Sequence, residues 1–355
     1  MRPIFIFGLL LALFTSLNAT SIFDLIETNG DARQLTIELP MDSIYAKSNN
    51  KQDAVLTFTD DTGLDQRWPL HVDVRGKFRR RICTLPPLKL DFDKGQLEAS
   101  GLARHDKLKL VIPCQEGDDY QSIVLREYMA YQLYAEMTPY HFRTQLVELT
   151  LVDANGSLPT RKIIGFILED TDEMAERLGG EEVDDLLGQP ESAWDRQAEV
   201  AQSMAQFLIG NHDYSLSMVR NLKQVRLSNS GLLVPVAYDF DFSQIVSAPY
   251  ATINSSVGQS TFSDRIYLGY IASDSDLGMA IERLKSKRKN LVSIVKEAKW
   301  LTYGDRYDIL NKINTAFYEF RRATRHNEDE SIYALLSRKH NGTTPARSVQ
   351  GLGRK

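Results

Sequence analysis

Between residues 34 and 113 the chain alternates apolar and polar residues in short runs. The runs cover residues 34–39, 54–60, 69–76, 86–92 and 108–113, and turn-forming sequences such as DDTG and FDKG lie between them. A period of two is typical of a half-buried β-strand, and clusters of aspartate and glycine favour turns. The pattern therefore predicts a β-rich first part of the chain.

The pattern becomes helical at residues 118–138, where Asp118 or Asp119 can cap the first turn. Apolar residues occupy most of the circumference of this segment, so we expect a largely buried helix. Two strands are predicted next, at residues 144–153 and 161–170, with the turn sequence ANGS between them.

A second helix is predicted for residues 192–209, and it ends at Gly210 because glycine readily takes the conformation that terminates helices. A β-hairpin of residues 219–228 and 232–242 follows, with NSG as its turn. From Leu277 onward the chain is mainly helical, and the polar, basic residues 341–355 are expected to be a disordered tail.

The first residues have the composition of an export signal. A basic start is followed by an apolar run, and Leu17, Asn18 and Ala19 end this run with the small residue that signal peptidase prefers. We therefore expect cleavage after Ala19 and a periplasmic or extracellular protein, with an uncleaved membrane anchor as the alternative. No later part of the sequence is long and apolar enough to cross a membrane, so we expect no integral span after cleavage.

The elements of the exported chain predict an α+β fold of two lobes. Residues 20–170 form a β-rich lobe with one long helix, and residues 171–340 form a mainly helical lobe. The net charge of −5 gives no reason to expect a nucleic-acid partner. Cys83 and Cys114 are compatible with a disulfide in an oxidising compartment, and two buried thiols are the alternative.

Two aspartates lie two residues apart on the return strand of the predicted hairpin. Asp239 and Asp241 would face the same side of this strand, which continues an apolar run at residues 232–236. Two carboxylates that point the same way from a buried strand need a cation. Mg²⁺ is favoured because it combines one or two carboxylates with substrate phosphates. Backbone N–H groups or an arginine are the alternative partners of these carboxylates.

Further polar residues precede the hairpin. Asp213 follows Gly210 in the turn GNHD, where a carboxylate held on a rigid scaffold could accept a proton from a hydroxyl group. Asn221 begins the outgoing strand and could add an amide oxygen to the metal site. Phosphoryl transfer uses such a set, because it needs a base that orients the nucleophile and an Asn and an Asp that hold Mg²⁺ against a triphosphate.

Phosphoryl transfer also uses a lysine that is paired with a glutamate on a helix. Lys89 alternates away from the apolar face of its strand, and Glu127 lies between apolar neighbours on the predicted helix. A glutamate in such a place needs a cationic partner, so we expect an ion pair that orients Lys89 toward phosphates. The basic sequence RGKFRRR, residues 75–81, is a second candidate for gripping phosphates, and a solvated basic strand is the alternative.

With these positions in place, the sequence resembles the spore-coat CotH-like family of atypical secreted kinases, and more distantly HipA-like kinases. The resemblance runs from about Val74 to Ala251. Its motifs are RGKFRRR, PPLKLDF, LREYMAYQLY, GFILED, FLIGNHDYS followed by RN, and VPVAYDFDFS. The resemblance implies a two-lobed, kinase-like fold that binds ATP with Mg²⁺.

The resemblance also implies roles for the matching residues. The implied catalytic residues are Asp213 as the catalytic-loop aspartate, Lys89 as the ATP lysine and Glu127 as its helix partner. The implied metal ligands are Asn221 and Asp239, which matches the aspartate of the kinase Asp-Phe-Gly motif, with Asp241 as the residue that could exchange roles with it. The implied nucleotide contacts besides Lys89 are Glu169, which with Asp170 ends the strand leading into the interlobe hinge, and Arg75.

The sequence thus predicts an exported kinase that transfers the γ-phosphoryl group of ATP to a hydroxyl group, with a protein as a candidate acceptor. A catalytically silent nucleotide-binding or scaffold protein of the cell envelope is one alternative. The other is a metal-dependent hydrolase built on Asp213, Asp239 and Asp241, which would not need the pair of Lys89 and Glu127.

Overall fold

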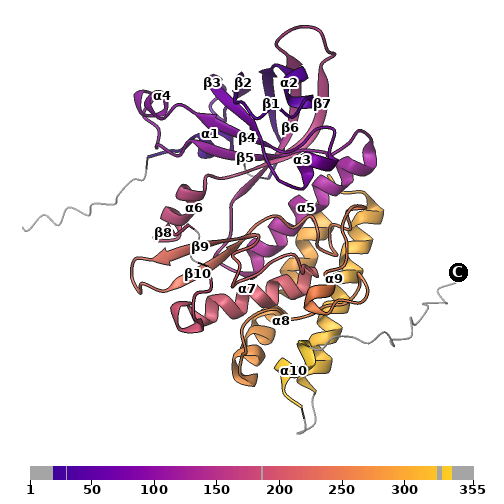
Figure 1. Cartoon of the computed structure of the whole chain (residues 1–355). Helices are drawn as coiled ribbons and strands as arrows, with labels where there is room; N and C mark the ends of the chain where they lie inside the picture. Colours follow the sequence, from indigo (N-terminus) through magenta and orange to yellow (C-terminus); the bar gives the residue numbers. More distant parts are fainter. Residues whose placement is uncertain (1–18, 29, 185–186, 326–329, 338–355) are drawn as a thin grey trace, which may run out of the picture.

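The structure is a computed structural model, and it describes residues 19–28, 30–184, 187–325 and 330–337. Figure 1 shows a strand-rich part and a helix-rich part that follow each other along the chain. The expected export signal lies outside the described residues except for its last residue, Ala19, and the expected tail lies wholly outside them. The described residues include no helix with the length and apolar character of a membrane span.

The strand-rich part is a closed barrel with the strand order β1-β2-β3-β4-β5-β7-β6. Its strands are β1 (Arg33–Leu39), β2 (Gln52–Thr59), β3 (Asp65–Val74), β4 (Leu88–Phe92), β5 (Lys107–Val111), β6 (Thr144–Asp153) and β7 (Arg161–Leu168). Strand β1 pairs antiparallel with β2 and parallel with β6, which closes the barrel. Inward-facing residues such as Leu35, Leu56 and Leu90 form its core.

Short helices lie before and between the barrel strands. They are α1 (Ile22–Ile26), α2 (Met41–Tyr45), α3 (Arg79–Ile82) and α4 (Lys94–Ala99). Helix α3 lies in the connection from β3 to β4, and it ends at Cys83, which forms a disulfide with Cys114 just after β5. Of the two alternatives that the sequence left open for these cysteines, the structure has the disulfide.

One long helix, α5 (Asp118–Met137), joins the barrel to the helix-rich part (Figure 1). It is buried around most of its circumference and contacts β7 on one side and α8 on the other. Its N-cap is Gly117, so neither Asp118 nor Asp119 is the cap; both lie in the first turn, where negative charge complements the positive end of the helix dipole. The helix therefore carries its buried residues, including Glu127, to the junction of the two parts.

The helix-rich part begins after β7. Its helices are α6 (Thr171–Arg177), α7 (Arg196–Ile209), α8 (Asp274–Glu297), α9 (Tyr303–Thr324) and α10 (Ile332–Leu336). A small antiparallel sheet in the order β10-β9-β8 consists of β8 (Gly180–Glu182), β9 (Leu222–Leu227) and β10 (Leu233–Ala237). The apolar core of the helix-rich part is continuous with the buried residues of α5.

The α+β content agrees with the prediction, and two details differ from it. The expected β-rich lobe closes into a barrel, because the first strand pairs with β6 more than one hundred residues later. The return strand is shorter than the expected residues 232–242, because β10 ends at Ala237. Asp239 and Asp241 therefore lie beyond the strand, and strand alternation does not determine where their side chains point.

Candidate functional site

The turn after α7 is held by the segment that follows the hairpin. Gly210 ends the helix with a left-handed φ of 69°, and a Cβ atom there would lie 2.5 Å from the Gln244 side chain, so glycine is required. Two residues later, Nε2 of His212 accepts a hydrogen bond of 3.0 Å from the backbone N–H of Ile266. Burial lowers the pKa of His212 to about 4, so this histidine is a neutral anchor. The turn presents Asp213 from a fixed backbone.

Asp213 and Asn221 are joined directly across the loop between them. The Nδ2 group of Asn221 donates to the Asp213 carbonyl at 2.6 Å and to Asp213 Oδ2 at 3.0 Å. Arg220 Nε lies 3.4 Å from Asp213 Oδ1. Burial raises the pKa of Asp213; Arg220 opposes this shift, and nearby Asp239 adds to it. The amide oxygen of Asn221 is thereby turned away from Asp213.

Asp239 is fixed between this loop and α5. The N–H of Tyr238 donates to the Asn221 carbonyl at 3.1 Å, and the N–H of Asp239 donates to the Tyr131 hydroxyl at 2.8 Å. Asn221 and Asp239 both have left-handed backbones, with φ of 52° and 63°. Such conformations are unfavourable for residues other than glycine and concentrate at functional sites. The structure thus brings Asp213, Asn221 and Asp239 together.

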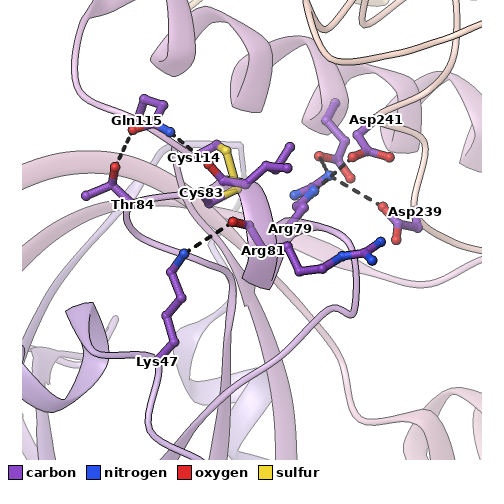
Figure 2. The surroundings of a disulfide bond; sticks show 11 residues. Lys47, Arg79, Arg81, Cys83, Thr84, Cys114, Gln115, Asp239 and Asp241 are labelled. Carbon is purple, nitrogen blue, oxygen red and sulfur yellow. Dashed lines mark hydrogen bonds and ion pairs between the residues drawn. A yellow bond between two sulfur atoms is a disulfide. The ribbon is translucent and has the colours of Figure 1, made fainter.

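Arg79 of α3 reaches the same place and binds three carboxylates at once (Figure 2). Its Nη2 lies 2.7 Å from Glu127 Oε2 and 3.4 Å from Asp239 Oδ1, and its Nε lies 2.9 Å from Asp241 Oδ2. The side chains of Glu127 and Asp241 are only 2% and 5% exposed, whereas that of Asp239 is 39% exposed. Arg79 is therefore the cation that the buried carboxylates of the site share.

The charges of this cluster are not balanced. Burial raises the pKa of both Glu127 and Asp241, and Arg79 opposes the shift in each case. Three ionised carboxylates around one guanidinium would leave two negative charges without a partner. An excess of this sign favours either a proton on one of the buried carboxyls or a further cation beside the partly exposed Asp239.

Lys89 does not form the expected ion pair with Glu127. Its Nζ lies 2.8 Å from Asp73 Oδ2, directly opposite on β3, and 3.9 Å from Asp91 Oδ2, two residues along its own strand. Glu127 lies on α5, which packs against β7, and β5 separates β7 from the strand of Lys89. The prediction of this pair was wrong because a neighbouring aspartate is closer to the lysine, and because Arg79 already occupies the position next to Glu127.

The other predicted nucleotide contacts are Glu169 and Arg75. Glu169 is fully buried, and its two oxygens accept hydrogen bonds of 2.5 to 3.1 Å from Arg143 and Arg177. Its carboxylate therefore joins Arg143, just before β6, to Arg177 of α6, and the N–H of Glu169 donates to the Arg143 carbonyl at 3.2 Å. Arg75 is half-buried at the start of the connection that carries Arg79, near enough to lower the pKa of Glu127.

Sequence reasoning missed two basic residues of this region. Arg79 stood among the arginines of RGKFRRR; the signals for it were the need of Glu127 for some cation and the alternative of an arginine as the partner of Asp239 and Asp241, which is the partner that the structure has. Lys109 lies on β5, where it is directly opposite Lys89. Its Nζ donates to Thr171 Oγ1 at 2.6 Å and lies 4.7 Å from the centre of the Phe142 ring. Burial lowers the pKa of Lys109 to about 7.

Comparisons with known proteins leave the family open. No protein-family model matches the chain, and no curated protein matches it. Nine chains of solved structures match. One of them is the crystal structure of CtkA, a proinflammatory kinase of Helicobacter pylori, with 12% sequence identity and a TM-score of 0.38 over 66% of this chain and 95% of that one. A likeness of this degree carries no argument about function, and the proposals below depend on the residues of this chain.

Proposed function

We propose that this protein is an exported phosphotransferase that uses ATP and Mg²⁺ to phosphorylate a hydroxyl group. The observation that carries the proposal is the meeting of Asp213, Asn221 and Asp239 beside the buried ion pair of Arg79 and Glu127. Phosphoryl transfer uses a base, an amide oxygen and a carboxylate that hold the metal, and a cation that a helix glutamate holds in place.

The residues present fit a magnesium ion bound together with a nucleotide. In the described residues no group of three or more His, Cys, Asp or Glu side chains could hold a metal ion. Mg²⁺ needs no such group, because it commonly takes one or two protein ligands and completes its shell with phosphate oxygens and water. Asp239 and Asn221 would hold it, because the Asp239 carboxylate is the exposed one of the cluster.

The roles of the side chains follow from their surroundings. When bound, Mg²⁺ and ATP supply the phosphoryl group and the charge that neutralises it. Asp213 would accept the hydroxyl proton of the acceptor, and the hydrogen bonds from Asn221 keep its carboxylate in place. Asp241 is held by Arg79 Nε and is almost fully buried, so we assign it to the support of the cluster.

The test measures transfer of label from γ-labelled ATP in the presence of Mg²⁺. The acceptors are the protein itself and a model peptide that contains Ser, Thr and Tyr. Asp213→Asn is expected to lower the rate by about a hundredfold or more, because general base catalysis contributes about that much. Asp239→Asn is expected to lower the rate and to raise the Mg²⁺ concentration needed for half-maximal activity.

Asp53→Asn is the matched control, because the Asp53 side chain is 95% exposed on the barrel, where it pairs with His71. This variant should transfer label at the parent rate. Full activity of Asp213→Asn or Asp239→Asn would contradict the assignment of the site. Absence of both transfer and nucleotide binding in the parent protein would contradict the proposed function itself.

A catalytically silent nucleotide-binding or scaffold protein is the second candidate, and one observation favours it. Asp241, one of the two aspartates that the sequence offered as metal ligands, is tied to Arg79, and the expected lysine is engaged elsewhere. Binding of Mg²⁺ and ATP without transfer of label would support this candidate. Release of phosphate that does not depend on Arg79 or Glu127 would support a hydrolase. The structure favours a hydrolase less, because Asp241 is tied to Arg79 and is less suited to bind a metal.

Export is the second part of the proposal, and the disulfide between Cys83 and Cys114 supports it. Disulfides persist in oxidising compartments such as the periplasm and the extracellular space. The intact mass of the protein recovered from the periplasm of a bacterial host is expected to lack the first residues through Ala19 and to show the disulfide. Recovery of the full-length chain with free thiols from the cytoplasm alone would contradict export.

A further inference from the structure

The connection between β3 and β4 reaches from the barrel onto the candidate site. We call residues 75–83 the bridging segment. At its start the N–H of Arg75 donates to the Pro87 carbonyl at 2.9 Å. In its middle the Phe78 ring packs against Phe242 and Tyr250, with ring centres 5.5 and 6.0 Å apart. The bridging segment is therefore fixed to the barrel and packed against the residues that follow Asp241.

The strand that leads into α5 offers no cation to Glu127. Lys109 and Val111 of β5 share one face of this strand, because residues two apart point the same way. Val111 lies at the end nearer α5, opposite Phe166, and belongs to the apolar core that includes Ile123 of the helix. The cation that pairs with Glu127 therefore comes from another element. It is Arg79 of the bridging segment.

The disulfide joins the two elements that carry this ion pair. Cys83 ends the turn that holds Arg79, and its N–H donates to the Arg79 carbonyl at 2.8 Å. Cys114 lies in the segment that leads into α5, and its carbonyl accepts a hydrogen bond of 2.9 Å from Thr84. The Cys83–Cys114 bond thus fixes the base of the Arg79 turn against the start of the helix that carries Glu127 (Figure 2).

We propose that Arg79 is the positioning residue that orients nucleotide phosphates in this protein, in the place of a strand lysine, and that the disulfide holds it there. The inference rests on the proposed function. The contacts with described residues engage Nε and Nη2 of Arg79, and Nη1 remains for a phosphate oxygen. A guanidinium suits this task because it binds carboxylates and phosphate oxygens through a fixed fork of donors.

The first experiment measures the binding of a non-hydrolysable ATP analogue with Mg²⁺ by calorimetry. Arg79→Ala is expected to weaken binding by about tenfold to a hundredfold, because a hydrogen bond between charged groups is worth about that much. Arg79→Lys is expected to recover part of this loss, since lysine keeps the positive charge but lacks the planar set of N–H donors of a guanidinium. Arg104→Ala is the matched control, because Arg104 follows α4, outside the bridging segment, and its side chain is 61% exposed, so this variant should bind within about twofold of the parent.

Parent affinity in the Arg79→Ala variant would overturn the role of Arg79. Equal losses in Arg79→Ala and Arg79→Lys, with both variants folded, would also overturn it, because a role in orienting phosphates requires that the charge matters. The variant with both Cys83→Ser and Cys114→Ser is expected to bind the analogue several-fold more weakly while remaining folded. Unchanged affinity in this variant would overturn the role of the disulfide.

A second readout needs no nucleotide, so it separates this inference from the proposed function. Trypsin cleavage after the arginines of the bridging segment is followed by mass spectrometry in the parent and in the double serine variant. We expect cleavage there to accelerate about tenfold in the variant, while cleavage after Arg226 on the small sheet keeps its rate. Equal rates in the two proteins, or an equal rise at Arg226, would overturn the claim that the disulfide holds Arg79 locally.

Discussion

Replacing Arg79 by methionine tests how the central cluster is held together. Methionine keeps much of the length and apolar contact of the arginine stem and removes its charge and its donors. Glu127 and Asp241 would then lose the guanidinium that now lies 2.7 and 2.9 Å from them. The two carboxylates would remain buried without a cation.

The contacts set the size of the expected loss. Removing one partner of a buried ion pair lowers the free energy of unfolding by about 3–5 kcal/mol. Two hydrogen bonds between charged groups, at about 1.5–3 kcal/mol each, lead to a similar range. The contact with Asp239 adds little, because it is 3.4 Å long and its carboxylate is partly exposed to water. We therefore expect the free energy of unfolding of the Arg79→Met variant to be about 3–5 kcal/mol lower than that of the parent near pH 8.

The loss should shrink at lower pH. Burial raises the pKa of Glu127 and Asp241 even with Arg79 in place, and removal of Arg79 should raise both pKa values further. A carboxyl whose pKa is higher in the folded than in the unfolded state favours folding when it is protonated, and this contribution is lost as the pH rises through the folded value. The deficit of the variant is therefore largest near pH 8 and smaller near pH 5.

Urea unfolding followed by circular dichroism at both pH values measures this deficit. Arg81→Met is the control, because Arg81 is exposed, and its effect should stay within about 0.5 kcal/mol. Adding Glu127→Gln to Arg79→Met should recover part of the loss, since one buried charge is removed. A deficit below about 1 kcal/mol, or one that grows on acidification, would refute the view that Arg79 neutralises the cluster.

Three further predictions concern groups around the site. Lys109→Met is expected to raise the free energy of unfolding at pH 6 by about 1–3 kcal/mol, because burial lowers the pKa of this lysine to about 7 and makes its charge unfavourable in the folded state. The gain should shrink as the pH rises above 7 and become small near pH 10.5, where about half of the lysine is already neutral in the unfolded state, as urea unfolding at the two pH values would show. The free energy of unfolding of the variant with Cys83→Ser and Cys114→Ser is expected to be about 3–4 kcal/mol lower than that of the parent, since the disulfide closes a loop with a sequence separation of 31. With a thiol reductant added, the parent should melt at the same temperature as this variant. An unchanged melting temperature in the variant would count against this account. Glu169→Gln is expected to lower the free energy of unfolding by about 2–4 kcal/mol, because Arg143 and Arg177 would no longer have a buried negative charge to pair with. Glu148→Gln, at an exposed position, should unfold like the parent, and equal stability of both variants would argue against a stabilising role for the ion pairs of Glu169.

Local patterns predicted most of the elements near the site. Alternation located β4 and β5, helical periodicity located α5, and Gly210 marked the end of α7. These features depend on residues close in sequence, so a single chain is enough to find them. The closure of the barrel depends on the pairing of β1 with β6, and no local pattern encodes a partner at that separation.

The same distinction applies to the charged residues. A buried helix glutamate requires a cation wherever it lies, so the need of Glu127 was determined by sequence alone. The identity of its partner depends on distances across the fold. Lys89 lies opposite an aspartate on the neighbouring strand, while Arg79 is brought to Glu127 by a connection that a disulfide fixes.

The sequence by itself thus determined the β-rich and helical parts, the turn that carries Asp213, and the presence of carboxylates that need cations. Only the tertiary structure decided which cation meets which carboxylate, that β10 stops before Asp239, and that Asp241 is buried while Asp239 stays partly exposed. The physical reason is that hydrogen-bonding needs and periodicity are properties of single segments, whereas ion pairing and burial depend on which segments pack together.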